Sequence, residues 1–234
     1  MSFKYETHMH TSEGSGCGGS TGAEQARAYK KRGYQGIIIT DHFINGYSSC
    51  PINAYFSSIK DRRMIWEKKM EYVVAGYKAA KAEGDRIGLD VFLGWEFTVR
   101  GSDFLTYGLD WDFLIKHPDV DKLDVPEYSA LVRACGGFIA QAHPYRKAAY
   151  IEYQFPVAPE LLDAVEVYNA SDTSESNNQA LKFAIDNNLP FQAGSDSHRA
   201  KLRFSSGIEL KTRAESIFDI INAIKAREVE LIVP

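Results

Sequence analysis

Apolar runs alternate with amphipathic segments along most of the chain. Strand-like runs occur near residues 3–8, 35–40, 89–97, 104–108, 137–142, 163–168, 190–194 and 206–210. Apolar residues recur at helical spacing near residues 21–33, 60–84, 126–135, 174–187 and 214–226. Strands that alternate with helices are typical of a mostly parallel sheet covered by helices. The pattern predicts an α/β fold, and 234 residues without a linker or an internal repeat predict one domain over 1–234.

Two connections are longer than simple turns require, at residues 43–59 and 109–125. Connections of that length in a compact domain often form lids or walls of a binding site. We therefore expect these two segments to determine which substrate is accepted.

Histidines and carboxylates follow the strand-like runs directly. They occur at five places along the chain, as His8 and His10, Asp41 and His42, Glu96, His143, and Asp196 and His198. The carboxyl ends of parallel strands meet on one face of an α/β fold, and active sites lie there. Imidazole nitrogen and carboxylate oxygen are ligands for zinc, manganese and iron. A single histidine at a strand end is usually a hydrogen-bonded core or surface residue, but five such signals together predict a polynuclear metal site.

The remaining histidine, His117, has a different setting. It precedes Pro118 in a polar stretch with no strand before it, so we expect an exposed loop residue.

Composition narrows the class of protein. Hydrophobic content of 44% and charged content of 25% are ordinary for a globular domain. The three cysteines are odd in number and lack metal-finger spacing, which favours reduced thiols and a cytoplasmic location. No apolar run is long enough to span a membrane, and the first residues lack a signal-peptide core. A net charge of −4 argues against nucleic acid as a partner, and oligomeric state is not predicted.

Five motifs resemble, in order, those of the PHP (polymerase and histidinol phosphatase) superfamily. They are His8-x-His10-Thr11, Thr40-Asp41-His42, Gly94-Trp95-Glu96, Ala142-His143-Pro144 and Gly194-Ser195-Asp196-Ser197-His198. The resemblance implies a distorted (β/α)7 TIM-like barrel of the PHP type, so the single domain would be a PHP domain. It also implies a cluster of two or three divalent ions (Zn, Mn or Fe) and hydrolysis of phosphoesters.

The resemblance also implies ligand roles. A first ion would be held by His8, His10, Glu96 and Asp196, and Glu96 would bridge to a second ion held by His143. A third ion would be held by His42 and His198.

Two positions depart from the commonest pattern of the family. The third ion needs another side chain from the loop after the first motif, and Glu13 is preferred there over Cys17. Glu13 would suit manganese, iron or zinc, whereas a cysteine would select zinc. The second ion often has another histidine from the strand after Glu96, but here Asp103 stands at that point.

Several other residues are candidates for catalysis and substrate binding. Glu96 and Asp196 are expected to act in catalysis as ligands, and Arg146 follows His143 closely enough for its guanidinium to grip phosphate oxygens. Further substrate-binding candidates are Arg199, directly after His198, and Asn169, at a strand end. Asp41 either orients the imidazole of His42 or caps the loop.

These observations predict a metal-dependent phosphoric ester hydrolase acting on a small phosphorylated metabolite or nucleotide. The ions would lower the pKa of bound water and clamp phosphoryl oxygens. A 3′–5′ exonuclease or oligonucleotide phosphatase is an alternative, disfavoured by the net negative charge. An amidohydrolase-type metal hydrolase is another alternative, but it would ordinarily need a lysine at a strand end, and none of the strand ends named above carries one. A non-catalytic module would have lost ligands, whereas nearly all of them are present here.

Overall fold

The computed structural model describes the chain except for residues 1, 45–61, 150, 152–155 and 202–203. Its elements, in chain order, are β1 (Phe3–Glu6), α1 (Gly22–Lys31), β2 (Gly36–Ile39), α3 (Arg62–Val73), α4 (Ala75–Ile87), β3 (Asp90–Val99), β4 (Ser102–Tyr107), α5 (Trp111–Lys116), η1 (Val120–Lys122), α6 (Val125–Ala134), β5 (Phe138–Gln141), η2 (Pro159–Leu161), β6 (Ala164–Asn169), α7 (Ser174–Asp186), β7 (Phe191–Gly194), β8 (Gly207–Leu210), α8 (Ile217–Ala226) and β9 (Glu230–Ile232).

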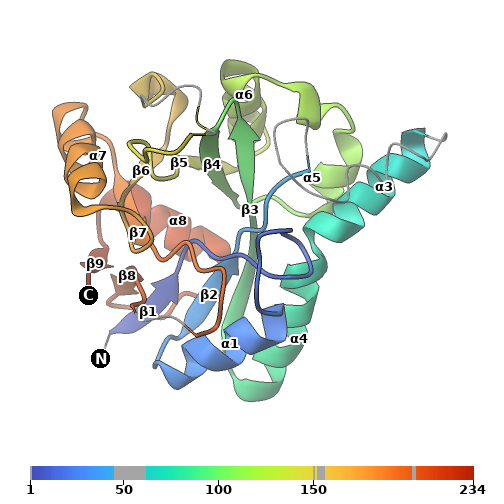
Figure 1. Cartoon of the computed structure of the whole chain (residues 1–234), viewed down its shortest axis with the longest axis horizontal. Helices are drawn as coiled ribbons and strands as arrows, with labels where there is room; N and C mark the ends of the chain where they lie inside the picture. The colour runs from blue at the N-terminus through green and yellow to red at the C-terminus, as the bar shows by residue number, and fades with distance from the viewer. Residues whose placement is uncertain (1, 45–61, 150, 152–155, 202–203) are drawn as a thin grey trace.

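The strands form one curved sheet in the order β7-β6-β5-β4-β3-β2-β1-β8-β9 (Figure 1). Strands β1–β2–β3 and β5–β6–β7 run parallel, whereas β4 is antiparallel to both its neighbours, as are β8 and β9 to theirs. The sheet nearly closes, because the segments after β1 and β7 meet in a parallel bridge between Met9 and Ser197. A barrel-shaped α/β fold is therefore confirmed. Most strands run in one direction, as expected, but β4 and β8 are reversed, since alternation of apolar residues does not encode strand direction.

Two predicted segments differ from the observed elements. The helix expected over 60–84 is divided at Val74, although backbone hydrogen bonds continue across it. The expected loop at 109–125 contains α5 and η1, with Asp110 capping α5, so about half of it is helical. Most of the other expected loop, residues 45–59, lies outside the described residues.

Helix α1 begins and packs as its sequence dictates. Thr21 and Glu24 form a capping box that satisfies the first free amides of the helix. Helices α1 and α4 lie side by side at one edge of the barrel (Figure 1). A β-carbon at Gly22 would collide with the carbonyl of Gly76, and one at Gly76 would collide with Thr11. Gly22 therefore lets α4 approach α1, and Gly76 lets α4 approach Thr11 at the end of the first motif.

The core beside the functional end of the barrel contains buried hydrogen bonds between aromatic side chains. The fully buried Tyr128 hydroxyl lies 2.7 Å from both the Trp95 indole nitrogen and the Thr106 hydroxyl. The Tyr128 ring also stacks on Phe97 with centroids 3.8 Å apart. This network fixes strands β3 and β4, which carry Glu96 and Asp103, against α6.

Candidate metal centre

Glu96 lies at the middle of a buried cluster of imidazoles. Its Oε1 is 3.2 Å from Nε2 of both His8 and His143. Its Oε2 is 3.3 Å from His10 Nε2 and 3.0 Å from His42 Nδ1. One carboxylate thus contacts four ring nitrogens from three separate segments, which is the position that a carboxylate bridging two ions would take.

Asp196 approaches the same cluster from the end of β7. Its Oδ1 lies 3.3 Å from His10 Nε2, 3.4 Å from His198 Nδ1 and 3.7 Å from His8 Nε2. The Nε2 atoms of His8 and His10 are themselves 3.2 Å apart. Imidazole lone pairs directed at one point beside a carboxylate suit a divalent cation.

Three overlapping groups of donor atoms emerge from this arrangement, and within each group the donors lie within 4.8 Å of one another. The groups are His8, His10 and Asp196; His8, Glu96 and His143; and His10, Cys17, His42 and His198. The nitrogen-rich and oxygen-containing donor set fits zinc, manganese or iron.

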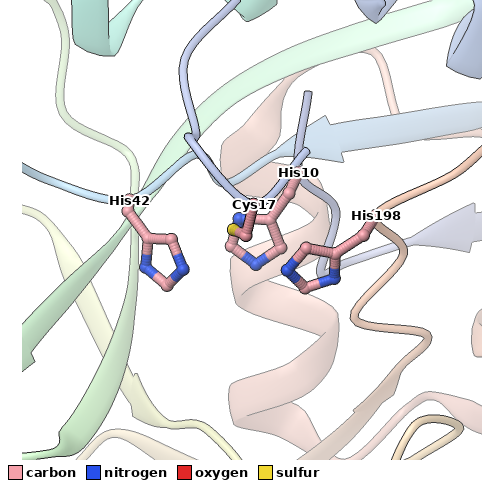
Figure 2. Close-up of side chains that lie close together, drawn as sticks. All are labelled: His10, Cys17, His42 and His198. Carbon is pink, nitrogen blue, oxygen red and sulfur yellow. The ribbon is translucent and has the colours of Figure 1, made fainter. Parts of the chain in front are cut away.

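Cys17, and not Glu13, reaches the third group. Figure 2 shows the Cys17 sulfur beside the rings of His10, His42 and His198. The Glu13 carboxylate instead accepts hydrogen bonds of 3.0 and 3.2 Å from the amide of Gly22, at the first turn of α1. A carboxylate there interacts favourably with the helix dipole. The positions of the two side chains therefore favour Cys17, the second choice from the sequence, over Glu13 as a donor at this group.

The loop that carries Cys17 is shaped by close backbone contacts. The Gly19 amide donates to the carbonyl of His198 at 2.7 Å. A β-carbon at Gly18 would collide with the Thr11 carbonyl, and one at Gly14 would collide with the Asp41 carboxylate. Because only glycine fits these two positions, the loop can fold back far enough to bring its thiol to the histidines.

Charges in the cluster shift the pKa values of its side chains in the direction opposite to the effect of burial. Burial alone would lower the pKa of His8 and His42, but nearby carboxylates, including Glu96 beside both, raise these pKa values well above the usual one. Burial would likewise raise the pKa of Glu96 and Asp196, but neighbouring imidazoles, His8 foremost, hold both pKa values well below the usual range. The metal-free cluster is thus a set of buried ion pairs, and metal binding must displace the imidazole protons.

The pKa values of His10 and Cys17 are both lowered. Burial, together with the neighbouring His42, lowers the pKa of His10 to about 3. Burial opposes ionisation of Cys17, but hydrogen bonds with His198 and His42 lower the pKa of its thiol to about 7. A neutral imidazole and a thiolate are the ligand forms that metal ions require.

Asp41 caps the loop and does not orient the ring of His42. Its carboxylate accepts 2.7 Å hydrogen bonds from the Thr11 amide and the Ser15 hydroxyl. The Ser15 oxygen in turn lies 3.2 Å from His10 Nδ1. The geometry therefore links Asp41 to His10 through Ser15 and leaves His10 Nε2 directed at the cluster.

Asp103 lies next to the cluster but outside the three donor groups. Its Oδ2 is 3.7 Å from His143 Nε2, and its Oδ1 accepts a 2.6 Å hydrogen bond from Thr98. Burial, followed by the charge of Glu96, raises the pKa of Asp103 to about 6.

Arg146 and Asn169 are occupied by protein partners. The Arg146 Nη2 lies 2.7 Å from Asp196 Oδ2 and 3.2 Å from the Asn169 oxygen. The Asn169 oxygen also accepts from the Ser171 amide, and its nitrogen donates to Glu166 at 2.9 Å. Asn169 is fully buried and connects Arg146, Ser171 and Glu166. Arg146 contacts the Asp196 carboxylate and keeps 17% of its side chain exposed.

The remaining sequence candidates are at the periphery. Arg199 is exposed, and its side chain passes 3.0 Å from where a Gly19 β-carbon would stand, on the rim beside His198. His117 lies outside a helix, directly after α5, as expected, but it is half-buried and not exposed, because its ring packs against Phe113.

Glu166 was not a candidate from sequence, yet its side chain is fully buried against His8. The available signal was a carboxylate between Val165 and Val167 in an otherwise apolar strand. Such a residue needs a buried partner.

Comparison with known proteins agrees with the motifs. Residues 174–229 match the model of the PHP-associated family. No curated protein matches the chain.

Solved structures share the fold at low sequence identity. A two-domain protein from Bacteroides vulgatus, described as containing a predicted PHP-like metal-dependent phosphoesterase, has a TM-score of 0.70 and 16% identity over 99% of this chain and 64% of its own. A lesion-specific endonuclease from Pyrococcus furiosus has a TM-score of 0.63 and 15% identity over 99% of this chain and 58% of its own. An amidohydrolase from Chromobacterium violaceum has a TM-score of 0.56 and 13% identity over 94% and 96%. This chain therefore spans less than two thirds of the first two proteins.

Among the described residues, no helix has the length and apolar character needed to cross a bilayer. The PHP-associated match over residues 174–229 and the barrel fold shared with a PHP-like protein agree with the resemblance of the ordered motifs to the PHP superfamily.

Proposed function

We propose that this protein is a metal-dependent phosphoesterase that removes phosphate from a small phosphorylated metabolite or nucleotide. The observation that carries the proposal is the Glu96 carboxylate, whose two oxygens lie within 3.3 Å of four imidazole nitrogens. Phosphoryl transfer needs concentrated positive charge and a positioned nucleophile, and a multi-metal cluster supplies both.

We assign the ligands by distance and by the rule that one ring nitrogen binds one ion. His8, His10 and Asp196 would hold a first ion, with Glu96 bridging to a second ion on His143, beside Asp103. The third group would then use Cys17, His42 and His198, because His10 Nε2 faces Glu96 and Asp196. A thiolate there favours zinc at that position.

The protein's own residues have distinct tasks in this scheme. Divalent ions at the cluster would polarise the phosphoryl group and lower the pKa of the attacking water. Glu96 fixes the spacing of the ligand groups. Arg146 holds Asp196 through its Nη2 group, and the exposed part of the guanidinium would contact phosphoryl oxygens. Arg199 on the rim is a second candidate for that contact.

Substrate class is the open choice within this proposal. The net charge of −4 favours a small phosphoester over a polynucleotide, whose binding draws on basic surfaces. An endonuclease and an amidohydrolase both share the fold, so the experiment must compare those chemistries directly.

The test is a substrate panel with the protein reloaded separately with zinc, manganese and iron. The panel contains a chromogenic phosphomonoester, a phosphodiester, a single-stranded oligonucleotide, and an amide or lactone. We expect the monoester to be cleaved fastest, with inorganic phosphate as a competitive inhibitor and a partial defect in Arg146→Lys. Cleavage of the amide or lactone alone would overturn the proposal, and faster cleavage of the oligonucleotide would favour a nuclease.

A further inference from the structure

Glu166 is the buried carboxylate beside His8 that the sequence motifs do not include. Its Oε1 lies 3.0 Å from His8 Nδ1, and both side chains are fully buried. The opposite ring nitrogen, His8 Nε2, faces Glu96 at 3.2 Å and Asp196 at 3.7 Å. The imidazole is therefore held between a carboxylate outside the cluster and the cluster itself.

The second oxygen of Glu166 is also engaged. Its Oε2 accepts a 3.1 Å hydrogen bond from the His143 amide and a 2.9 Å hydrogen bond from the Asn169 side chain. His143 has a φ of 28°, an unfavourable value for a residue other than glycine. Glu166 thus contacts the ring of one proposed ligand, His8, and the backbone amide of a second, His143.

The space for this contact is provided by Gly194 at the end of β7. A β-carbon there would stand 2.5 Å from Glu166 Oε1 and 2.6 Å from the His8 β-carbon. Any side chain at Gly194 would therefore push the imidazole and the carboxylate apart.

We propose that Glu166 is a positioning residue that fixes His8 in the Nδ1–H tautomer, so that its Nε2 lone pair points at the metal centre. A carboxylate can only accept a hydrogen bond, so the neutral ring must carry its proton on Nδ1. Carboxylate–histidine–metal arrangements orient the ring and make the ligand more basic. This inference rests on the metal centre proposed above.

The first test compares Glu166→Gln with Asp163→Asn. Asp163 directly precedes the same strand, β6, and accepts from the Ile139 amide at 3.0 Å, away from the cluster. Glutamine cannot accept from the His8 ring, the His143 amide and Asn169 together, because one of its two polar atoms is a donor. We expect about 10–100-fold weaker zinc binding in Glu166→Gln by chelator competition, and unchanged binding in Asp163→Asn.

A spectroscopic readout separates positioning from a general loss of stability. The absorption bands of the Co²⁺-loaded protein should shift in Glu166→Gln, whereas simple destabilisation would lower the melting temperature of the metal-free protein and leave the bands unchanged. Wild-type zinc affinity and wild-type bands in the variant would overturn the inference about Glu166 alone. A wild-type protein that binds no metal would overturn the metal centre as well.

A measurement on the wild-type protein covers the case in which Glu166→Gln does not fold. Long-range ¹H–¹⁵N NMR of the zinc-loaded protein should show a protonated His8 Nδ1 and a metal-bound Nε2. An unprotonated Nδ1 would overturn the inference.

Discussion

Replacing Glu96 with glutamine tests whether one carboxylate organises the whole cluster. The change keeps the shape of the side chain but removes a charge that lies 3.0–3.3 Å from four imidazole nitrogens. A pair of unit charges about 4 Å apart interacts by about 4 kcal/mol at an effective dielectric constant of about 20. Because about 1.4 kcal/mol corresponds to a tenfold change, we expect roughly a thousandfold weaker binding of at least one ion.

A second effect acts in the opposite direction. Glu96 raises the pKa of His8 and His42 in the metal-free protein, so the variant releases their protons more easily. Competition from protons weakens as pH rises, so measuring at about pH 8.5 reduces this compensation.

The assay is chelator competition together with elemental analysis, followed by turnover of a chromogenic phosphomonoester. The matched control is Glu71→Gln, which removes the same charge from an exposed position on α3 and should change neither quantity. Normal metal content, affinity and turnover in Glu96→Gln would show that Glu96 does not bridge the ions.

Three further predictions follow from particular contacts. By elemental analysis, Cys17→Ser should lose zinc from the third group, whereas Glu13→Gln should keep full metal content. The reason is that the Glu13 carboxylate accepts from the Gly22 amide at the start of α1; the opposite result would restore Glu13 as the ligand. Apparent zinc affinity should rise as pH increases above about 6.5, since His8 and His42 retain protons above that ordinary pKa; a flat profile by calorimetry would contradict this. Tyr128→Phe should lower the free energy of unfolding, measured by urea denaturation, by about 2–4 kcal/mol, because it deletes the hydroxyl and leaves the buried Trp95 N–H and Thr106 hydroxyl without this partner; a loss under about 0.5 kcal/mol would refute the network.

The sequence predicts the strand-end positions of the site well, because residues directly after apolar strands are placed by the sheet itself. His8 and Asp196 follow β1 and β7 in this way, and the structure brings their side chains together. Glu96 was expected at a strand end but lies inside β3, which continues to Val99, and its side chain still reaches His8. Cys17 could not be chosen over Glu13, because an aperiodic glycine-rich loop carries no register from which to read side-chain direction. Its course depends on backbone contacts between residues distant in sequence, such as Gly19 with His198.

Two further features could not be predicted from the spacing of apolar residues along the chain. A strand that alternates apolar and polar residues looks the same in either direction, so the antiparallel placement of β4 was not foreseen. Asn169 ends β6 as expected, but its contact with Arg146 joins it to the loop after β5 and could not be read from the sequence, whereas its other partner, Glu166, lies on β6 itself.

The seam between β1 and β7 has a consequence for how the molecule folds. The Met9–Ser197 bridge and the His10–Asp196 contact join segments separated by most of the chain. Contacts between such distant residues require the closure of a very long loop, so they form late and slow the folding of the domain. We therefore expect an ion held by His10 and Asp196 to be captured in the last step, joining the segments after β1 and β7 once the intervening strands have paired.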